Sequence, residues 1–334
     1  MKRFYVFAIS IALIIILILW IGPENIINTF KTVNLKWVFV ALLIHFLAIG
    51  VRSFRWGFII NKPLEFKNNY IVKVIGLFAG NFSPMRTAGE VMGAVAAKKI
   101  NKINLSEGLS AGLTERFFDL VIVGFLLIIS SIWVENTRFM SMLGGSVTLF
   151  IVVLIYLINW REDTSIWIYE KIHPFLCKLP INDNVLDNMY FKFRDGLKRM
   201  TGYTNSFTTS KNLIFVCIMS IMAWLLECFR LYIVFYAFGV DINFVAVIII
   251  FLIANIIGVI SALPGGIGSI EVAITGILVF FGVSGALAGS IAIADRLVSF
   301  WATTVLGIIF SSYYAGDMLG EVKKYTLDLK MYEE

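Results

Sequence analysis

A segment rich in proline and glycine, residues 261–271 (SALPGGIGSIE), interrupts a long apolar stretch and sets the strongest limit on the fold. Apolar runs at residues 244–260 and 272–281 flank it. Proline and paired glycines do not continue a helix readily, and irregular backbone at membrane depth survives only where protein buries it or where it lines a wet cavity. A helix restarting near Gly266 would aim its free N–H groups at whatever occupies the break. The segment therefore predicts the broken helix of a transporter site. A short turn outside the membrane is the alternative, because a span needs about 20 apolar residues.

Composition places the chain in a membrane. Of its 334 residues, 59% are hydrophobic and 15% are charged, and the mean hydropathy is +0.86, which is too apolar for a soluble protein. The net charge of +6 suits cationic cytoplasmic edges, and no basic run is interleaved with aromatic residues as in a nucleic-acid-binding domain. Cysteines without paired spacing and isolated histidines predict neither a disulfide framework nor a metal site: Cys177, Cys217, Cys228, His45 and His173. We therefore expect no cofactor and no metal.

Six apolar stretches are read as full spans: residues 4–21, 37–60, 109–134, 143–160, 213–238 and 286–313. Lys2 and Arg3 precede the first, which lacks the short core and small-residue cleavage site of a signal peptide, so we expect an uncleaved span with a cytoplasmic N-terminus. Residues 161–210 form the one substantial polar segment, where apolar residues at helical spacing predict an amphipathic interfacial helix.

A second interruption lies between residues 71 and 97. The apolar run at residues 71–81 is too short to span and ends in Asn81, Pro84, Gly89 and Glu90 before apolar sequence resumes at residues 91–97. Two short arms around a proline and glycine break predict a re-entrant hairpin.

The two interruptions belong to an internal repeat. Arg116 lies 32 residues after Pro84, and Arg296 lies 32 residues after Pro264. An acid, Glu115 or Asp295, precedes each arginine. In the span before each hairpin two charged residues stand three apart, namely Arg52 with Arg55 and Glu227 with Arg230. Each half therefore has the order span, span, hairpin, span.

An odd number of crossings per half means that the second copy is inverted. The predicted fold class is an all-α polytopic integral membrane protein with an inverted-topology repeat and two re-entrant hairpins. The first repeat covers residues 1–139 around Pro84, and the second covers residues 140–316 around Pro264 with the cytoplasmic loop 161–210. Residues 317–334 form a charged cytoplasmic tail. Lysines and arginines gather on one side, which places both termini in the cytoplasm.

The charged residues inside the spans have two interpretations. Each ionisable group costs about 2.5–3.5 kcal/mol at the centre of a bilayer, so they face one another or a hydrated cavity. Ion pairs that lock the repeats together, such as Arg116 with Asp119 or Glu271 with Arg296, are one interpretation; Arg52 and Arg55 could also snorkel to the cytoplasmic surface. The other is an anionic head group held by arginines and by helix N–H groups. The candidate substrate-binding residues are Arg52, Arg55, Asn81, Pro84, Gly89, Glu90, Glu115, Arg116, Glu227, Arg230, Pro264, Gly265, Gly266, Gly268, Glu271, Asp295 and Arg296.

These motifs together resemble the lysylphosphatidylglycerol synthase transmembrane, flippase-like family over nearly the whole chain. The resemblance rests on residues 81–90, Glu115-Arg116, residues 264–271 and Asp295-Arg296. It implies the membrane domain that moves aminoacylated phosphatidylglycerol between leaflets, and some relatives are linked to polyprenyl-linked sugars. The appended aminoacyltransferase domain of the synthases is not found in these 334 residues, so synthase activity is not implied. The first motif departs from the usual glycine-rich form at residues 85–87.

We therefore expect a cell-membrane flippase for a lipid with an anionic, phosphate-containing head group. No nucleophile–base dyad or P-loop predicts an enzyme. Two alternatives are a non-transporting scaffold for a lipid- or glycan-modifying enzyme and an ion-coupled carrier of a small soluble anion. The expected partners are membrane lipids, phospholipid or polyprenyl-linked, with a second copy of the chain or a lipid-modifying enzyme as further candidates and no nucleic acid.

Overall fold

The computed structural model describes residues 2–62, 64–83, 88–160 and 210–314. Every regular element in these ranges is a helix, as the sequence predicts. Pro84, the amphipathic helix and cytoplasmic loop expected within residues 161–210, and the tail at residues 317–334 lie outside the described residues, apart from Ser210.

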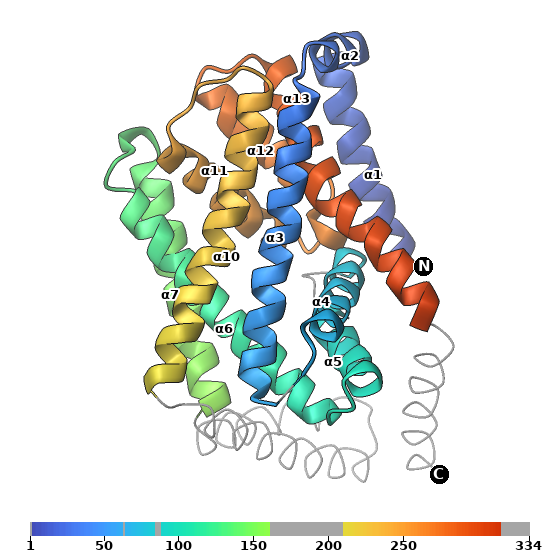
Figure 1. Cartoon of the computed structure of the whole chain (residues 1–334). Coiled ribbons are helices and arrows are strands. Elements are labelled where there is room, and N and C mark those ends of the chain that lie inside the picture. The colour runs from blue at the N-terminus through green and yellow to red at the C-terminus, as the bar shows by residue number, and fades with distance from the viewer. Residues whose placement is uncertain (1, 63, 84–87, 161–209, 315–334) are drawn as a thin grey trace.

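The helices follow one another in a simple order (Figure 1). They are α1 (Lys2–Ile21), α2 (Pro23–Lys31), α3 (Leu35–Ile60), α4 (Phe66–Asn81), α5 (Ala88–Ile100), α6 (Leu105–Ser130), α7 (Arg138–Trp160), α10 (Ser210–Ala237), α11 (Phe244–Ile260), α12 (Ser269–Phe280) and α13 (Gly285–Arg296). Short turns η2 (Glu135–Thr137) and η3 (Pro264–Gly266) connect some of them, and a π-helical turn, η4 (Leu297–Trp301), follows α13.

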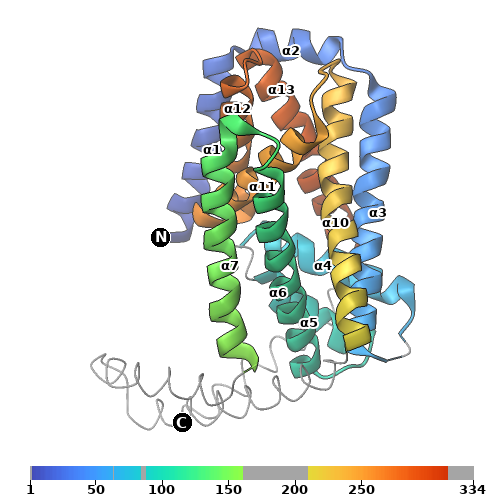
Figure 2. The ribbon, with the colours of Figure 1, turned by 90° about the vertical axis from the view of Figure 1, so that its left-hand side faces the viewer.

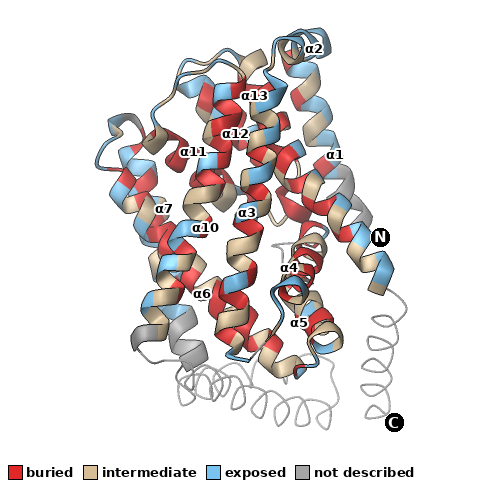
Figure 3. Ribbon diagram, in the orientation of Figure 1, coloured by how far each residue is buried: buried red, intermediate tan, exposed pale blue. Residues whose placement is uncertain are grey.

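The protein is a multi-pass α-helical membrane protein. Three helices in the described ranges are long and apolar enough to cross a membrane, namely Leu35–Ile60, Asn212–Ala237 and Gly285–Tyr314. A bent pair, Ile9–Ile21 with Pro23–Lys31, makes a fourth if it is counted as one span. Large apolar side chains are exposed around the outside (Figure 3), among them Phe139 and Phe150 of α7. Such a surface suits contact with lipid tails.

One helix was absent from the sequence prediction. In the sequence, the first predicted span ends at residue 21 and no helix is predicted directly after it, but α2 begins at Pro23 and turns 77° away from α1. Proline is favourable at the first helical position, and Gly22 before it adopts a φ of 90°. The Asn25 side chain then donates to the Ile21 carbonyl at 2.9 Å. A bend between two helices depends on local turn geometry, which the spacing of apolar residues does not indicate.

Two pairs of short helices occupy opposite ends of the bundle (Figures 1 and 2). The α4–α5 pair lies in the lower half of both views, and the α11–α12 pair lies in the upper half. The long helices α3 and α10 pack along each other and run together along the right-hand side of Figure 2. One apolar core joins α10, α11, α12 and α13, and a smaller one joins α3, α4, α5 and α6.

The ends of the two short-helix pairs meet inside the protein. Gly265 in η3 lies so close to α4 that a Cβ there would stand 2.6 Å from the Asn81 carbonyl oxygen and from the Phe300 ring. Its φ of 57° also favours glycine. The Asn81 side chain donates to Thr304 at 3.2 Å and to the Phe300 carbonyl at 3.4 Å. The break between α11 and α12 is therefore packed against the end of α4 and against the last long helix, Gly285–Tyr314.

Candidate functional site

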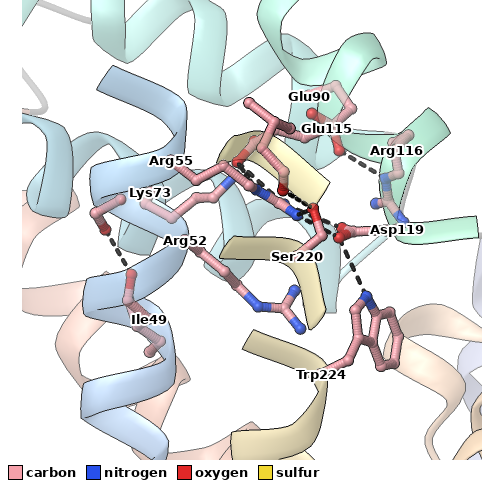
Figure 4. Close-up of polar contacts among 12 residues, drawn as sticks. Ile49, Arg52, Arg55, Lys73, Glu90, Glu115, Arg116, Asp119, Ser220 and Trp224 are labelled. Carbon is pink, nitrogen blue, oxygen red and sulfur yellow. Dashed lines mark hydrogen bonds and ion pairs between the residues drawn. The ribbon is translucent and has the colours of Figure 1, made fainter. Parts of the chain in front are cut away.

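A network of ion pairs joins α3, α4 and α6 in the lower half of the bundle (Figure 4). The Arg55 guanidinium donates to Asp119 at 2.6 Å and to Glu115 at 3.2 Å. It also donates to the Ser220 hydroxyl of α10 at 2.6 Å. Lys73 of α4 forms an ion pair with Glu115. Arg55 is fully buried, so these acids offset the cost of placing its charge there.

Arg116 and Glu90 form a neighbouring pair between α6 and α5. Arg116 Nε donates to Glu90 Oε1 at 2.7 Å, and the two side chains are 40% and 25% exposed. Gly112 on α6 leaves the space that the Glu90 carboxylate occupies, because a Cβ there would collide with Glu90 Oε2. We call the six residues Arg55, Lys73, Glu90, Glu115, Arg116 and Asp119 the first network.

A second network lies in the upper half of the bundle. Arg230 of α10 donates to Asp295 of α13 at 2.5 Å and to Glu227, one turn earlier, at 3.0 Å. Arg296 donates to Glu271 of α12 at 3.1 Å and to the Gly265 carbonyl at 2.9 Å. With Arg52, whose Nη2 lies 3.9 Å from Glu227 Oε1, these residues make up the second network: Arg52, Glu227, Arg230, Glu271, Asp295 and Arg296.

The same pairing pattern occurs in both networks. An arginine on the helix before the short-helix pair, Arg55 or Arg230, binds the acid that precedes Arg116 or Arg296. Arg116 and Arg296 in turn bind a glutamate on the second short helix. The ion pair between Glu271 and Arg296 is confirmed. The other expected ion pair, Arg116 with Asp119, is replaced by two different ones. Asp119 is paired with Arg55, and Arg116 is paired with Glu90.

Arg52 differs from the buried arginines Arg55, Arg230 and Arg296. It makes no hydrogen bond within the described residues, and its Nε is buried without a partner. The guanidinium lies 5.4 Å from the centre of the Trp224 ring, and the Trp224 indole donates to Asp119 at 3.1 Å. Figure 4 shows Arg52 extending from α3 toward Trp224. The Arg52 side chain is 15% exposed, so a mostly buried guanidinium that makes no hydrogen bond lies beside Glu227 and Trp224.

His45 is a residue that sequence reasoning missed. We interpreted it as isolated, but its Nε2 lies 2.8 Å from Thr303 Oγ1 and its Nδ1 lies 3.4 Å from Glu227. His45 stands seven residues before Arg52, two helical turns along one face of α3, and that spacing could have identified it. Lys73 was also missed, although it is the one charged residue in the apolar run at residues 71–81.

The remaining candidate residues pack helices together. Gly89 on α5 abuts α4, where a Cβ would lie 2.8 Å from the Gly76 carbonyl oxygen. Gly268 donates its N–H to Glu271 at 2.8 Å and begins α12. Pro264 and Gly266 are buried in η3. Gly89 thus allows α5 to lie against α4, and Pro264, Gly266 and Gly268 shape the break that leads into α12.

Two further features bear on ligands. An apolar hollow of about 600 Å³ lies on the outer side of α10, between Ile218 and Phe229, and reaches Phe244 of α11. Within the described ranges, no group of three His, Cys, Asp or Glu side chains could hold a metal ion.

Comparison with known proteins identifies similar chains in archaea. The family model described as "Lysylphosphatidylglycerol synthase TM region" matches residues 7–307. A UPF0104 membrane protein from Methanothermobacter thermautotrophicus is 53% identical over 99% of both chains. A UPF0104 membrane protein from Methanocaldococcus jannaschii is 26% identical, with 90% of this chain and 91% of that protein covered. Another from Pyrococcus horikoshii is 24% identical, with 92% and 96% covered.

Proposed function

The chain belongs to the lysylphosphatidylglycerol synthase transmembrane family, and on that premise we propose that it moves a lipid with an anionic, phosphate-containing head group between leaflets. The family is linked to lipid-related membrane function. Arg52 is the observation that carries the proposal, because its guanidinium is mostly buried and makes no hydrogen bond within the described residues. A buried donor without an acceptor costs free energy, and a phosphate would supply the acceptor.

Arginine suits this role better than lysine would. Its planar fork donates two parallel hydrogen bonds to one phosphate. The Trp224 ring beneath Arg52 adds a cation–π contact that holds the guanidinium in place. Arg55, Arg230 and Arg296 make ion pairs with carboxylates at 3.2 Å or less, so we assign them to holding the helices together. Arg52 Nη2 lies 3.9 Å from Glu227 Oε1 and forms no hydrogen bond with it.

The first network supplies the approach to Arg52. Arg116 is more exposed than its counterpart Arg296, and the Lys73 side chain is 17% exposed. Both cations would attract an anionic head group before it reaches Arg52. The apolar hollow on α10 would hold an acyl chain while the head group is inside, because it is lined by aliphatic and aromatic side chains.

The proposal includes an inverted repeat with two re-entrant hairpins. Three observations support it: the short-helix pairs lie in opposite halves of the bundle, the ion-pair pattern recurs, and Gly265 abuts the end of α4. Two such hairpins meeting from opposite sides would separate the leaflets and form the fixed site of an alternating-access carrier.

Leaflet exchange by purified protein tests the function. Proteoliposomes carrying fluorescent phosphatidylglycerol are treated with impermeant dithionite, which bleaches only the outer leaflet. We expect wild type to expose the inner-leaflet probe. Arg52→Lys should reduce the rate about tenfold, the equivalent of one charge-assisted hydrogen bond of about 1.5 kcal/mol.

Arg138→Lys is the matched control, because Arg138 is an exposed arginine whose ion pair with Glu135 lies outside both networks. Equal rates for Arg52→Lys, Arg138→Lys and wild type would remove Arg52 from the mechanism. No exchange by folded wild type would overturn the function. Competition by glycerol 3-phosphate as strong as by phosphatidylglycerol would favour a carrier of small soluble anions.

One observation favours the scaffold alternative. Most charges within the described bundle are paired, which is what a packed, non-transporting membrane protein needs. A scaffold would give no leaflet exchange, and it would co-purify with a lipid- or glycan-modifying enzyme. Static size-exclusion measurements would show in the same experiment whether a second copy of the chain is the partner.

The orientation is also a proposal. We infer cytoplasmic termini from the lysine and arginine bias in the sequence. Single cysteines placed at position 135 or 239 should react with an impermeant reagent from outside intact cells, and one at position 98 should not. Labelling with the opposite pattern would invert the topology.

A further inference from the structure

We propose that His45 takes up one proton for each anionic head group bound, with Glu227 as its counter-ion. This inference rests on the proposed function and adds the coupling ion to it. The proton comes from the aqueous phase, binds His45 Nδ1 and leaves again when the head group is released.

The argument begins with the charge balance of the interior. The first network contains three cations and three acids, joined by the ion pairs of Arg55, Lys73 and Arg116. The second contains Arg52, Arg230 and Arg296 with three acids. Each network is therefore neutral when His45 is neutral. A phosphate on Arg52 adds a negative charge beside Glu227, and a buried charge without a counter-charge is strongly unfavourable.

His45 is placed to supply the compensating positive charge. Its Nδ1 is buried, has no hydrogen-bond partner and lies 3.4 Å from Glu227 Oε2. In the neutral ring only one nitrogen carries a proton. If that is Nε2, donating to Thr303 at 2.8 Å, then the Nδ1 lone pair faces a carboxylate. Protonation makes both nitrogens donors, so Nε2 keeps Thr303 and Nδ1 gains a charge-assisted bond to Glu227.

Among the described residues around His45, the acids of α10 and α13 already have partners. On α10, Glu227 is already bound to Arg230, and Cys228 beside it is buried. On α13, Asp295 is bound to Arg230. The last long helix contributes the neutral Thr303. On α3 itself the nearest charge is Arg52, and α11 carries no titratable residue.

Calorimetry on the purified full-length protein measures this coupling directly. Dioctanoyl phosphatidylglycerol is titrated into the protein in buffers with different ionisation enthalpies, which gives the number of protons taken up per lipid. We expect about one proton where His45 is neutral in the free protein and charged in the complex. By linkage, affinity there should fall about tenfold for each unit rise in pH.

Two variants locate the proton. His45→Gln keeps a hydrogen-bonding side chain but cannot bind the proton, so its uptake should be near zero and its affinity independent of pH. His173→Gln is the matched control: it changes the only other histidine in the chain, which lies outside the described residues, and should behave as wild type.

The outcomes separate the two proposals. Binding of phosphatidylglycerol by wild type without proton uptake would overturn the coupling and leave the lipid site standing. Undiminished uptake by His45→Gln would overturn His45 as the proton site. Absence of both binding and leaflet exchange in folded wild type would overturn the proposed function itself. Proton uptake by the wild-type protein tests the coupling without any variant, so the test still holds if a variant fails to fold.

Discussion

Arg116 and Arg296 have matching positions in the two networks and different surroundings. The Arg116 and Glu90 side chains are 40% and 25% exposed, whereas those of Arg296 and Glu271 are 8% and 7% exposed. Arg296 also donates to the Gly265 carbonyl and lies 4.6 Å from the centre of the Phe300 ring. The same pairing pattern thus gives a buried ion pair in the second network and a partly exposed ion pair in the first.

The difference separates two uses of the same chemistry. A buried ion pair contributes little net stability, but removing one partner leaves the other charge uncompensated. An exposed pair is screened and replaceable, so it can exchange its partner for a ligand. We therefore expect substitutions in the second network to affect folding and those in the first to affect transport.

Removing an arginine from each network should give the largest contrast. Arg296→Ala leaves Glu271 buried without its cation, and we expect a loss of about 3–5 kcal/mol, enough to abolish the folded yield. Arg116→Ala should leave a monodisperse protein, because the Glu90 side chain is 25% exposed and does not become a fully buried charge without a partner. Fluorescence-detected size-exclusion chromatography in detergent measures both. Equal losses of yield would end the distinction between the networks.

Adding one methyl group to each short-helix pair should give the next largest effect. Gly265→Ala forces a side chain into a φ of 57° and against Asn81 and Phe300, at a cost of about 1–3 kcal/mol from backbone strain alone. Gly89→Ala brings a Cβ to 2.8 Å from the Gly76 carbonyl oxygen and 3.4 Å from Gly80 Cα, but Gly89 has no positive φ and the change gains helix propensity of about 1 kcal/mol. Thermal unfolding should show the larger fall for Gly265→Ala. A larger fall for Gly89→Ala would mean that the α4–α5 contact is the tighter one.

Lysine substitutions should separate transport from folding. Arg116→Lys keeps the charge and loses the two-pronged donor, so we expect leaflet exchange about tenfold slower with normal folding. Arg296→Lys should exchange lipid at close to the wild-type rate, because its role is to neutralise Glu271. Dithionite assays with matched protein amounts test this. Impaired exchange by Arg296→Lys alone would return the phosphate role to the second network.

The smallest effect should come from the ring beside Arg52. Trp224→Phe keeps an aromatic face under the guanidinium and removes the indole bond to Asp119, a loss of about 0.5–1.5 kcal/mol. We expect exchange to slow less than in Arg116→Lys. Trp301→Phe, at a half-exposed tryptophan of η4, serves as the control. If the two tryptophan variants behave alike, Trp224 does not position Arg52.

Much of the architecture could be predicted from one-dimensional patterns. Apolar runs located the long helices, and the positions of Pro84 and Pro264 located the short-helix pairs. The ion pair between Glu271 and Arg296 was one of two pairings considered. The α2 helix was missed, because it depends on a bend at Gly22.

The partners inside the networks were harder to predict, for a physical reason. Arg55 and Glu115 are 60 residues apart, and His45 and Thr303 are 258 apart. Helical periodicity says which residues share a face of one helix, but not which helices adjoin. The lone lysine at position 73 and the spacing of His45 and Arg52 were signals within single helices. Their meaning required the packing of α3 against α10.

The π-helical turn at Leu297–Trp301 determines the angular phase of the last long helix. A turn that holds an extra residue rotates everything after it by about 100° relative to an uninterrupted α-helix. Arg296 lies before this turn, and Thr303 and Thr304 lie after it. Arg296 contacts Glu271, whereas Thr303 contacts His45 and Thr304 contacts Asn81. The turn therefore sets the direction of the threonines relative to that of Arg296. Deleting a single residue from the turn would restore a continuous α-helix and rotate Thr303 and Thr304 away from His45 and Asn81. No substitution in the segment could reproduce that rotation.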